Sequence, residues 1–281
     1  MCNTKKVSSV LNEKKILSTI RNPFIIGLKY AFQNRKNYYL ALEYASGGDL
    51  FQILKSDKIL LQDIKLYIAE LAIAIQELHK NNIIYRDMKP ENVIICKDGH
   101  IKLIDFGLST FCDDNQPKTT FCGTPEFIAP EVIIGQGYDD RIDWWGLGIL
   151  TYELIYKSTP FYGMNVQYIY QSILTKDPVF PKNENPMVVS FISSLLQKDP
   201  VKRGGYNYIV DSDLFSDLDF NSVSEKKISP SFIPDIDNIL NQNSINRKSF
   251  NSDSDSDIQQ IASTDDNRAD DFSFNYIHDI S

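Results

Sequence analysis

Three short motifs dominate the middle of this 281-residue chain: YRDMKPEN at 85–92, DFG at 105–107 and APE at 129–131. Each is a cluster of charged or turn-forming residues between apolar runs, and DWWGLG follows at 143–148. A single tripeptide match carries little information. The order and spacing of all the motifs together restrict the chain to few folds and few chemistries.

Charge and composition exclude several classes of protein. Lys+Arg 29 against Asp+Glu 37 gives a net charge of −8, which argues against nucleic acid as the main partner. The longest apolar run, at 144–156, is too short for a membrane segment and contains Glu153. The N-terminus has no apolar signal core, and the four cysteines lack metal-ligand spacing. We therefore expect a cytoplasmic protein, with the nucleus as a second location.

Apolar periodicity predicts the main elements. Apolar residues at helical spacing predict helices over 9–20 and 62–80. Residues 25–33 and 37–44 are β-branched and aromatic and are separated by a polar turn, which predicts a hairpin. KDG at 97–99 predicts a second tight turn between strands, and helices dominate from residue 126 to 215. A small β part followed by a mostly helical body predicts the α+β class.

The composition changes late in the chain. From residue 241 onward Ser, Asn and Asp dominate, and such low hydrophobicity predicts disorder. Aromatic residues return near the end at Phe272, Phe274 and Tyr276, which favours a docking segment. Chance aromatic residues in a solvated tail are the alternative.

With its motifs in this order, the chain resembles the eukaryotic protein kinase family, and the resemblance begins near residue 8 and reaches the end of the chain. LEYASGGDLF at 42–51, TFCGTPEF at 120–127 and KKISPSFIP at 226–234 are similar to the AGC group, which includes protein kinase B. The resemblance implies a bilobal α+β fold with an incomplete small lobe at 1–45 and a mostly helical large lobe at 46–220. Residues 221–281 match the AGC tail and are expected to be largely disordered.

The same resemblance implies ATP and Mg²⁺ as cofactors, and transfer of the γ-phosphate to protein Ser or Thr. Asp87 resembles the catalytic aspartate that orients the substrate hydroxyl and accepts its proton, and Lys89 neutralises charge on the transferred group. Asn92 and Asp105 are oxygen donors that hold magnesium. An isolated aspartate is more often a turn or capping residue, but the motif spacing favours catalysis here.

Nucleotide and substrate contacts are also implied by the resemblance. The backbone from Glu43 to Ala45 matches the hinge that binds adenine. The full set of expected nucleotide-contacting residues is Leu42, Glu43, Ala45, Asp49, Glu91 and Ile94. Asp49, Glu91 and Glu153 are expected to select protein substrates with arginine upstream of the acceptor. A carboxylate inside an apolar helix needs a partner or a cleft, so a structural ion pair is the alternative for Glu153.

Other residues have structural or regulatory counterparts in the family. Glu131 and Arg203 are expected to form a buried ion pair, and Asp143 and Glu13 are expected to be structural. Thr120 matches the activation-loop threonine that an upstream kinase phosphorylates, with Arg86 capturing the phosphate. Ser273 lies in ADDFSF, which resembles the hydrophobic-motif phosphosite, although Ala269 replaces an aromatic residue.

The sequence departs from the family at its start. No Gly-rich loop and no strand lysine precede the hinge, so Glu13 lacks its expected lysine partner. We favour a kinase whose start is missing from the sequence, because Asp87, Asn92 and Asp105 are intact. A pseudokinase or fragment acting as a binding module is the alternative. A third possibility is a partner chain that supplies the missing strands by edge pairing.

Overall fold

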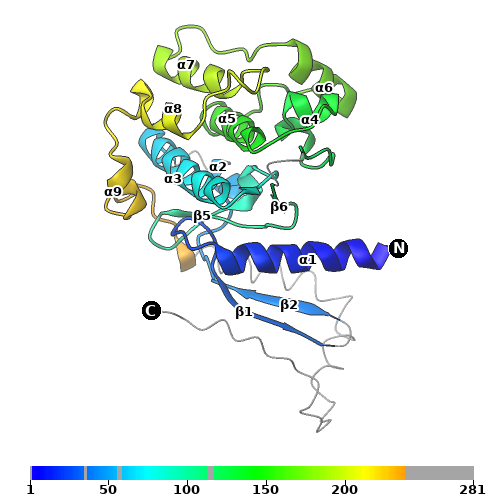
Figure 1. Ribbon diagram of the computed structural model, residues 1–281. Coiled ribbons are helices and arrows are strands. Elements are labelled where there is room, and N and C mark those ends of the chain that lie inside the picture. The colour runs from blue at the N-terminus through cyan, green and yellow to red at the C-terminus, as the bar shows by residue number, and fades with distance from the viewer. Residues whose placement is uncertain (1, 35–36, 56–58, 113–116, 238–281) are drawn as a thin grey trace, which may run out of the picture.

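The computed structural model describes residues 2–34, 37–55, 59–112 and 117–237. A helix and a β-hairpin form a small unit that lies below a larger, mostly helical body in Figure 1. The predicted α+β class is confirmed, with few strands in the small lobe and a helical large lobe.

The small unit consists of α1 (Cys2–Thr19), β1 (Leu28–Gln33) and β2 (Tyr38–Leu42). The helix predicted over 9–20 is present but begins seven residues earlier, at Cys2. Its last turns bury Ile16 and Leu17 completely or nearly so, whereas Leu11 remains 47% exposed. The predicted hairpin is also present, and its two strands pair antiparallel, with Phe32 opposite Tyr39.

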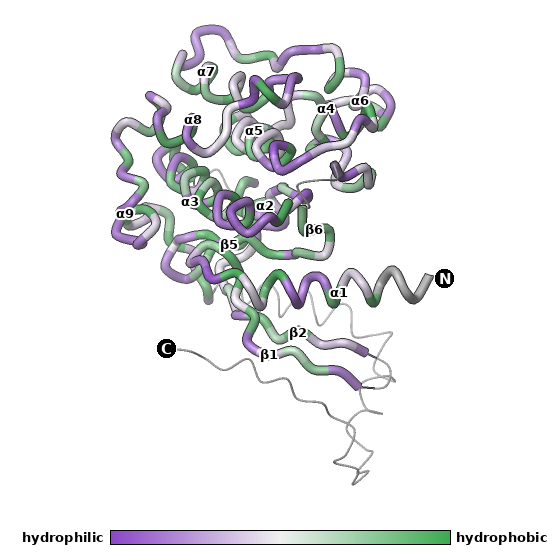
Figure 2. Tube along the Cα trace, in the orientation of Figure 1, coloured by the Kyte–Doolittle hydropathy of each residue, from purple (hydrophilic) through white to green (hydrophobic). Residues whose placement is uncertain are grey.

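Two long helices form the centre of the large body. α3 (Leu61–Lys80) and α5 (Arg141–Tyr156) contact each other, and both bury most of their side chains. In Figure 2 the tube of α1 has both purple and green stretches, so polar and apolar residues occur along the whole visible helix. The remaining helical elements are α2 (Leu50–Leu54), η1 (Pro90–Asn92), η2 (Pro125–Phe127), α4 (Pro130–Ile134), α6 (Val166–Thr175), α7 (Pro186–Leu195), α8 (Tyr206–Val210), η3 (Asp213–Phe215) and α9 (Phe220–Ser224).

Short strands join the two parts of the molecule. β3 (Ile83–Ile84) pairs with β6 (Thr110–Phe111), and β4 (Val93–Ile95) pairs with β5 (Ile101–Leu103) around the predicted KDG turn. The segment before β1 attaches to β5, because the Leu103 N–H donates to the Phe24 carbonyl and the Ile26 N–H donates to the Leu103 carbonyl. The small unit is therefore fixed directly to the strand that precedes DFG.

The segment at 226–234 lies against the large body and ends near the hinge. The Asp63 carboxylate of α3 accepts hydrogen bonds from the Ser231 N–H (2.7 Å) and hydroxyl (2.6 Å). Gly99 has a φ of +83°, and a Cβ there would lie 2.5 Å from the Phe232 carbonyl oxygen. The boundary expected after residue 220 falls inside α9, whose Val223 is buried against the core.

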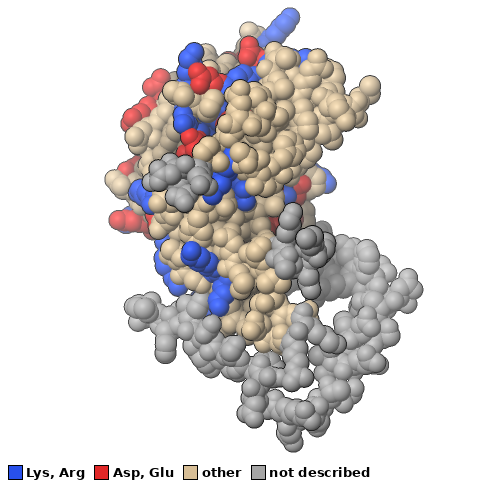
Figure 3. All heavy atoms as spheres, turned by 45° about the vertical axis from the view of Figure 1, so that its right-hand side comes forward, with Lys and Arg blue, Asp and Glu red and all other residues tan. Residues whose placement is uncertain are grey.

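Lys and Arg are interspersed with Asp and Glu on the face seen in Figure 3, where uncharged residues cover most of the surface. Among the described residues, no helix combines the length and apolar character that crossing a membrane requires.

Candidate active site

Asp87 lies on the loop between β3 and η1, and three polar side chains converge on its carboxylate. Lys89 Nζ and Asn92 Nδ2 each lie 2.8 Å from Asp87 Oδ2. The Thr124 hydroxyl donates more weakly to Oδ1, at 3.4 Å. Asp87 is only 6% exposed, so these bonds offset the cost of burying its charge. The structure thus brings together three of the residues expected from the sequence.

The backbone before Asp87 is held in an uncommon conformation. Arg86 has a φ of 72°, in the left-handed region that non-glycine residues rarely adopt. The buried Asp143 carboxylate accepts hydrogen bonds from the Tyr85 and Arg86 N–H groups, both at 2.8 Å. Asp143 therefore stabilises the turn that presents Asp87, a structural role of the kind expected for it.

Asp105 follows β5 and is exposed at the surface of the site. Its Oδ1 accepts a hydrogen bond from the Gly107 N–H at 3.1 Å, and its own φ is 58°. The N–H of Ile104, one residue earlier, donates to the Asn92 carbonyl at 2.9 Å. This bond ties together the two segments that carry the expected magnesium ligands.

The donor set of Asn92 and Asp105 fits a magnesium ion. Because Asn92 uses its amide nitrogen to hold Asp87, its amide oxygen is the atom available to a cation. Amide and carboxylate oxygens suit Mg²⁺, which usually takes its other ligands from water and substrate phosphates. Among the described residues, no group of three or more His, Cys, Asp or Glu side chains forms a self-sufficient metal site.

One face of α1 lies against the DFG segment. The Ser9 hydroxyl donates to the Gly107 carbonyl and the Asn12 amide donates to the Ser109 carbonyl, both at 2.7 Å. Glu13 lies on the same face, and burial, followed by the charge of Asp105, raises the pKa of its carboxyl. No ion pair involving Glu13 occurs within the described part of the chain. Glu13 thus lies close to a second carboxylate, that of Asp105.

The hinge leads from β2 into α2. Leu42 ends β2, and the Glu43 N–H donates to the Gly27 carbonyl at 2.7 Å. The Glu43 carboxylate lies 3.0 Å from Lys102 Nζ, so this side chain points back toward β5 rather than into open solvent. Ala45 is partly buried against the core. The backbone of Glu43 to Ala45 thus lies between the end of β2 and the N-cap of α2.

Asp49 has a local role that the sequence analysis missed. It is the N-cap of α2, where its Oδ1 accepts from the Gln52 N–H at 2.8 Å and its Oδ2 from the Gln52 amide at 2.7 Å. Asp49 also forms an isolated backbone bridge with Ile94. Two of the expected nucleotide-contacting residues are therefore neighbours across this bridge.

An acidic cluster forms around Glu153. Its Oε2 is buried, with no hydrogen-bond partner in the part of the chain that the structure describes. Burial, reinforced by the charges of Glu91 and then Glu126, raises the pKa of Glu153 to about 7. The alternative of a structural ion pair for Glu153 finds no partner among the described residues. The sequence analysis did not include Glu126 of η2 in this cluster. Its position in the TFCGTPEF motif, two residues after Thr124, could have identified it.

The activation segment is connected to the catalytic loop through Tyr138, which the sequence analysis also missed. Arg86 Nη1 donates to the Tyr138 hydroxyl at 3.0 Å, and that hydroxyl donates to the Thr120 carbonyl at 2.8 Å. Thr120 itself is exposed. The expected pairing of Arg86 with Thr120 is thus indirect in the unmodified chain. Ser273 lies outside the described residues.

The expected pair of Glu131 and Arg203 is present. Arg203 Nη1 and Nη2 lie 2.6 and 2.9 Å from the two Glu131 carboxylate oxygens. Arg203 also donates to the carbonyls of Arg141 and Gln197. The pair is buried and links α4, α5 and the loop before α8.

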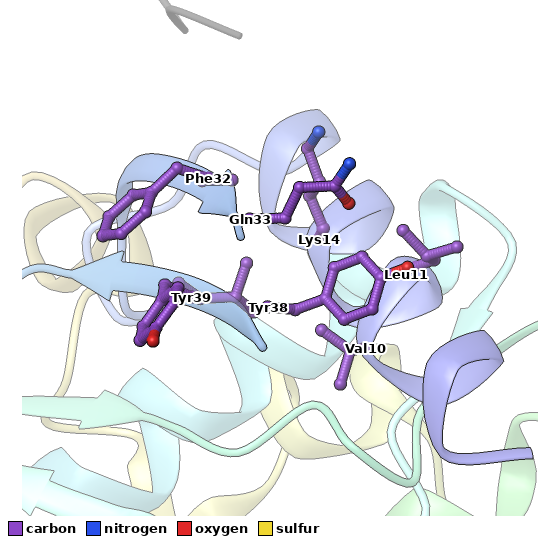
Figure 4. A pocket seen from close by; sticks show the side chains of 9 residues that line it. Val10, Leu11, Lys14, Phe32, Gln33, Tyr38 and Tyr39 are labelled. Carbon is purple, nitrogen blue, oxygen red and sulfur yellow. The ribbon is translucent and has the colours of Figure 1, made fainter. Parts of the chain in front are cut away.

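A cavity of about 220 Å³ lies between α1 and the hairpin, away from the catalytic loop. In Figure 4 the Tyr38 ring reaches toward Val10 and Leu11, and Lys14 lies at the rim. Most of the residues that line it are apolar or aromatic by type, and the lining consists of Val10, Leu11, Lys14, Ala31, Phe32, Gln33, Tyr38, Tyr39 and Leu40.

The chain is similar to known proteins over most of its length. The family profile described as the protein kinase domain matches residues 2–215. The chain is 42% identical over 192 residues to Protein kinase 2 of Dictyostelium discoideum, covering 68% of this chain and 40% of that protein. It is 44% identical over 196 residues to the serine/threonine-protein kinase gad8 of Schizosaccharomyces pombe, covering 68% and 34%.

A third relative, the RAC-beta serine/threonine-protein kinase of Rattus norvegicus, is 40% identical over 192 residues, covering 68% of this chain and 40% of that protein. These relatives are kinases of the AGC group. The chain spans less than half the length of the curated relatives it matches.

Breaking the buried ion pair is expected to destabilise the large body. Arg203→Ala leaves the Glu131 carboxylate buried and unpaired, which costs about 3–5 kcal/mol of unfolding free energy. The neighbouring Lys202→Ala removes only an exposed contact with Asp199, so its effect is expected to stay within about 0.5 kcal/mol. Urea denaturation of both variants measures the difference, and equal losses would contradict a structural role for the pair.

Proposed function

The chain belongs to the protein kinase domain family and to its AGC group, and from this premise we propose that it transfers phosphate from Mg–ATP to serine or threonine of proteins with nearby arginine. The observation that carries the proposal is the position of the Asp87 carboxylate, which Lys89 and Asn92 hold by hydrogen bonds. The Asn92 carbonyl in turn accepts the Ile104 N–H, which connects this loop to the segment of Asp105. Phosphoryl transfer depends mainly on positioning and charge neutralisation, which this arrangement supplies.

Each residue of the site has a distinct task in the proposed reaction. Asp87 would orient the substrate hydroxyl and accept its proton, because its Oδ1 has only the weak Thr124 contact among the described residues and is accessible for this task. Lys89 is close enough to Asp87 to neutralise charge on the transferred group. Asn92 and Asp105 would hold Mg²⁺, which neutralises charge on the nucleotide phosphates when bound.

Nucleotide recognition is assigned to the hinge. The backbone of Glu43 to Ala45 would hydrogen-bond the adenine, with the apolar side chains of Leu42 and Ile94 beside it. Leu42 is 36% exposed at the end of β2, so it is accessible to a ligand. The Asp49 carboxylate would exchange its contacts with Gln52 for the ribose.

The acidic cluster would bind the arginine of the substrate. Burial, and then the charges of Glu91 and Glu126, raise the pKa of Glu153, and a guanidinium bound there would offset the same repulsion. The buried, unpaired Oε2 of Glu153 is an acceptor that such a group would satisfy.

Two phosphorylations are proposed to regulate the enzyme. An upstream kinase would modify the exposed Thr120, and the phosphate would attract Arg86 from the Tyr138 hydroxyl that it now contacts. The aromatic residues around Ser273 would dock in the cavity between α1 and the hairpin, whose apolar lining and Lys14 suit an aromatic, acidic segment.

A binding module without phosphate transfer is the second candidate. It is favoured by one observation, the position of Glu13 beside Asp105, with no cation paired to Glu13 among the described residues. Such a site would bind nucleotide weakly, because a second carboxylate beside Asp105 repels the nucleotide phosphates.

Removal of Asp105 tests the proposed reaction. In the full chain, Asp105→Ala is expected to lower phosphate transfer to an arginine-containing peptide by at least about a hundredfold, because a charge-stabilising group is lost. Asp211→Ala, a control at an exposed aspartate of the large body, is expected to transfer at the wild-type rate. Transfer by Asp105→Ala at the wild-type rate would contradict the kinase proposal, and no transfer by the wild-type chain would favour the binding module.

Substrate selection is expected to depend on pH through Glu153. Because the pKa of Glu153 is about 7, the carboxyl is mostly charged at pH 8 and mostly neutral at pH 6. The KM for an arginine-containing peptide is therefore expected to rise as the pH falls across this range. Glu153→Gln should flatten the profile, and a peptide with norleucine in place of arginine serves as the control. Identical profiles for the wild type and Glu153→Gln would rule out Glu153 as the arginine contact.

A further inference from the structure

Lys102, the middle residue of β5, has a nearly buried ammonium group at the junction of β5, the hinge and the segment before β1. Its side chain is 10% exposed, although lysine usually lies at the surface. The Nζ atom lies 3.0 Å from Glu43 Oε2 in the hinge and donates to the Pro23 carbonyl at 3.0 Å. The Ile25 carbonyl is a further acceptor, at 3.5 Å. The motif-based analysis of the sequence assigned no role to Lys102.

These acceptors account for the hydrogen-bonding capacity of the ammonium group. A lysine has three N–H donors and no acceptor, and a buried ammonium without partners would be costly. Pro23 and Ile25 offer backbone carbonyls, whereas Glu43 offers a carboxylate. The contact with Glu43 therefore neutralises the charge of Lys102, and it is also the contact that reaches the hinge.

Glu43 is held against Gly27 by both its backbone and its side chain. Its N–H donates to the Gly27 carbonyl at 2.7 Å, and its Oε2 accepts the Gly27 N–H at 3.4 Å. The same Oε2 contacts Lys102, so the ammonium group and the Gly27 N–H share one oxygen. The Glu43 side chain is 38% exposed, and water competes for it. Lys102 thus favours the position of the carboxylate beside Gly27 over a solvated one.

The β5 strand provides a firm base for this contact. The N–H of Leu103, the residue after Lys102, donates to the Phe24 carbonyl at 2.8 Å, and the Ile26 N–H donates to the Leu103 carbonyl at 3.0 Å. The segment before β1 is therefore fixed to the strand by backbone hydrogen bonds. Residues 43–46 of the hinge belong to no helix or strand. The position of the hinge depends correspondingly more on side-chain contacts.

We propose that Lys102 is a positioning residue for nucleotide binding, which holds Glu43 against Gly27 and so fixes the hinge backbone at 43–45. The adenine nucleotide in this proposal rests on the proposed function, whereas the position of the hinge is a property of the folded chain. Adenine is remote from the phosphate that is transferred, so its binding is the same before and during the reaction. Lys102 therefore affects the affinity for nucleotide and not the catalytic step.

Two substitutions in the full chain test the contact. Lys102→Met keeps the aliphatic stem and removes the ammonium group. Glu43→Gln removes the negative charge from a partly exposed side chain, so it breaks the same ion pair and carries the test if Lys102→Met does not fold. Lys97→Met is the matched control, because Lys97 is exposed in the turn between β4 and β5.

Binding of adenosine, which has the adenine and the ribose but no phosphate, measures the hinge directly. Lys102→Met and Glu43→Gln are each expected to weaken adenosine binding about fivefold in isothermal titration calorimetry. The double variant is expected to bind less than about twofold more weakly than either single variant, because both remove one contact. The KM for Mg–ATP is expected to rise by the same factor as the adenosine Kd in Lys102→Met, with kcat at the wild-type value.

Amide hydrogen exchange provides a readout that needs no nucleotide. The Glu43 N–H, which is bonded to Gly27, is expected to exchange about threefold faster in Lys102→Met, with the core of α3 unchanged. Lys97→Met is expected to match the wild type in adenosine binding and in exchange.

Unchanged exchange at Glu43 in Lys102→Met would overturn the proposal, as would additive losses of adenosine affinity in the double variant. A fall in kcat at an unchanged KM, or equal effects of Lys97→Met, would also overturn it. If the wild-type chain bound no adenosine, the proposed function would fail. The exchange rate at Glu43 would then still decide whether Lys102 holds the hinge.

Discussion

A buried carboxylate, that of Asp143, organises the site. It accepts hydrogen bonds from the Tyr85 and Arg86 N–H groups and contacts His79, so one side chain of α5 connects α3 with the catalytic loop. The left-handed turn at Arg86 depends on these bonds, since a residue with a Cβ does not adopt that conformation without compensation. Asp87 occupies its position because the Asp143 carboxylate holds this turn.

The remaining parts of the site are attached to that turn by short connections. Asn92 holds the Asp87 carboxylate, and its carbonyl accepts the Ile104 N–H beside Asp105. From the other side, Ser9 and Asn12 of α1 bind the DFG segment. The buried helices α3 and α5 thus support the catalytic loop. Asp105 and Thr120 are exposed, so a ligand or a modifying enzyme can reach them.

The sequence predicted the parts of this arrangement that belong to continuous motifs. Asp87, Lys89 and Asn92 lie within one octapeptide, and the pair of Glu131 and Arg203 followed from family resemblance. Contacts made by residues far apart in the chain were not predictable in the same way. Glu126 acquires its neighbour Glu153 only when η2 packs against α5, and Tyr138 acquires its contact with Arg86 only when the loop before α5 meets the catalytic loop. Asp49 was assigned a ligand contact, whereas its position also satisfies the N-terminus of α2.

The central claim is that Asp143 determines the conformation of the loop that carries Asp87. The most direct measurement is a crystal structure of Asp143→Asn. This variant keeps the shape of the side chain but replaces one of the two oxygens that accept the Tyr85 and Arg86 N–H groups with an NH₂ group. The account predicts that Arg86 leaves the left-handed region and that Asp87 separates from Lys89 and Asn92, while α3 and α5 remain in place. An unchanged turn at Arg86, with Asp87 still bound to both residues, would contradict it.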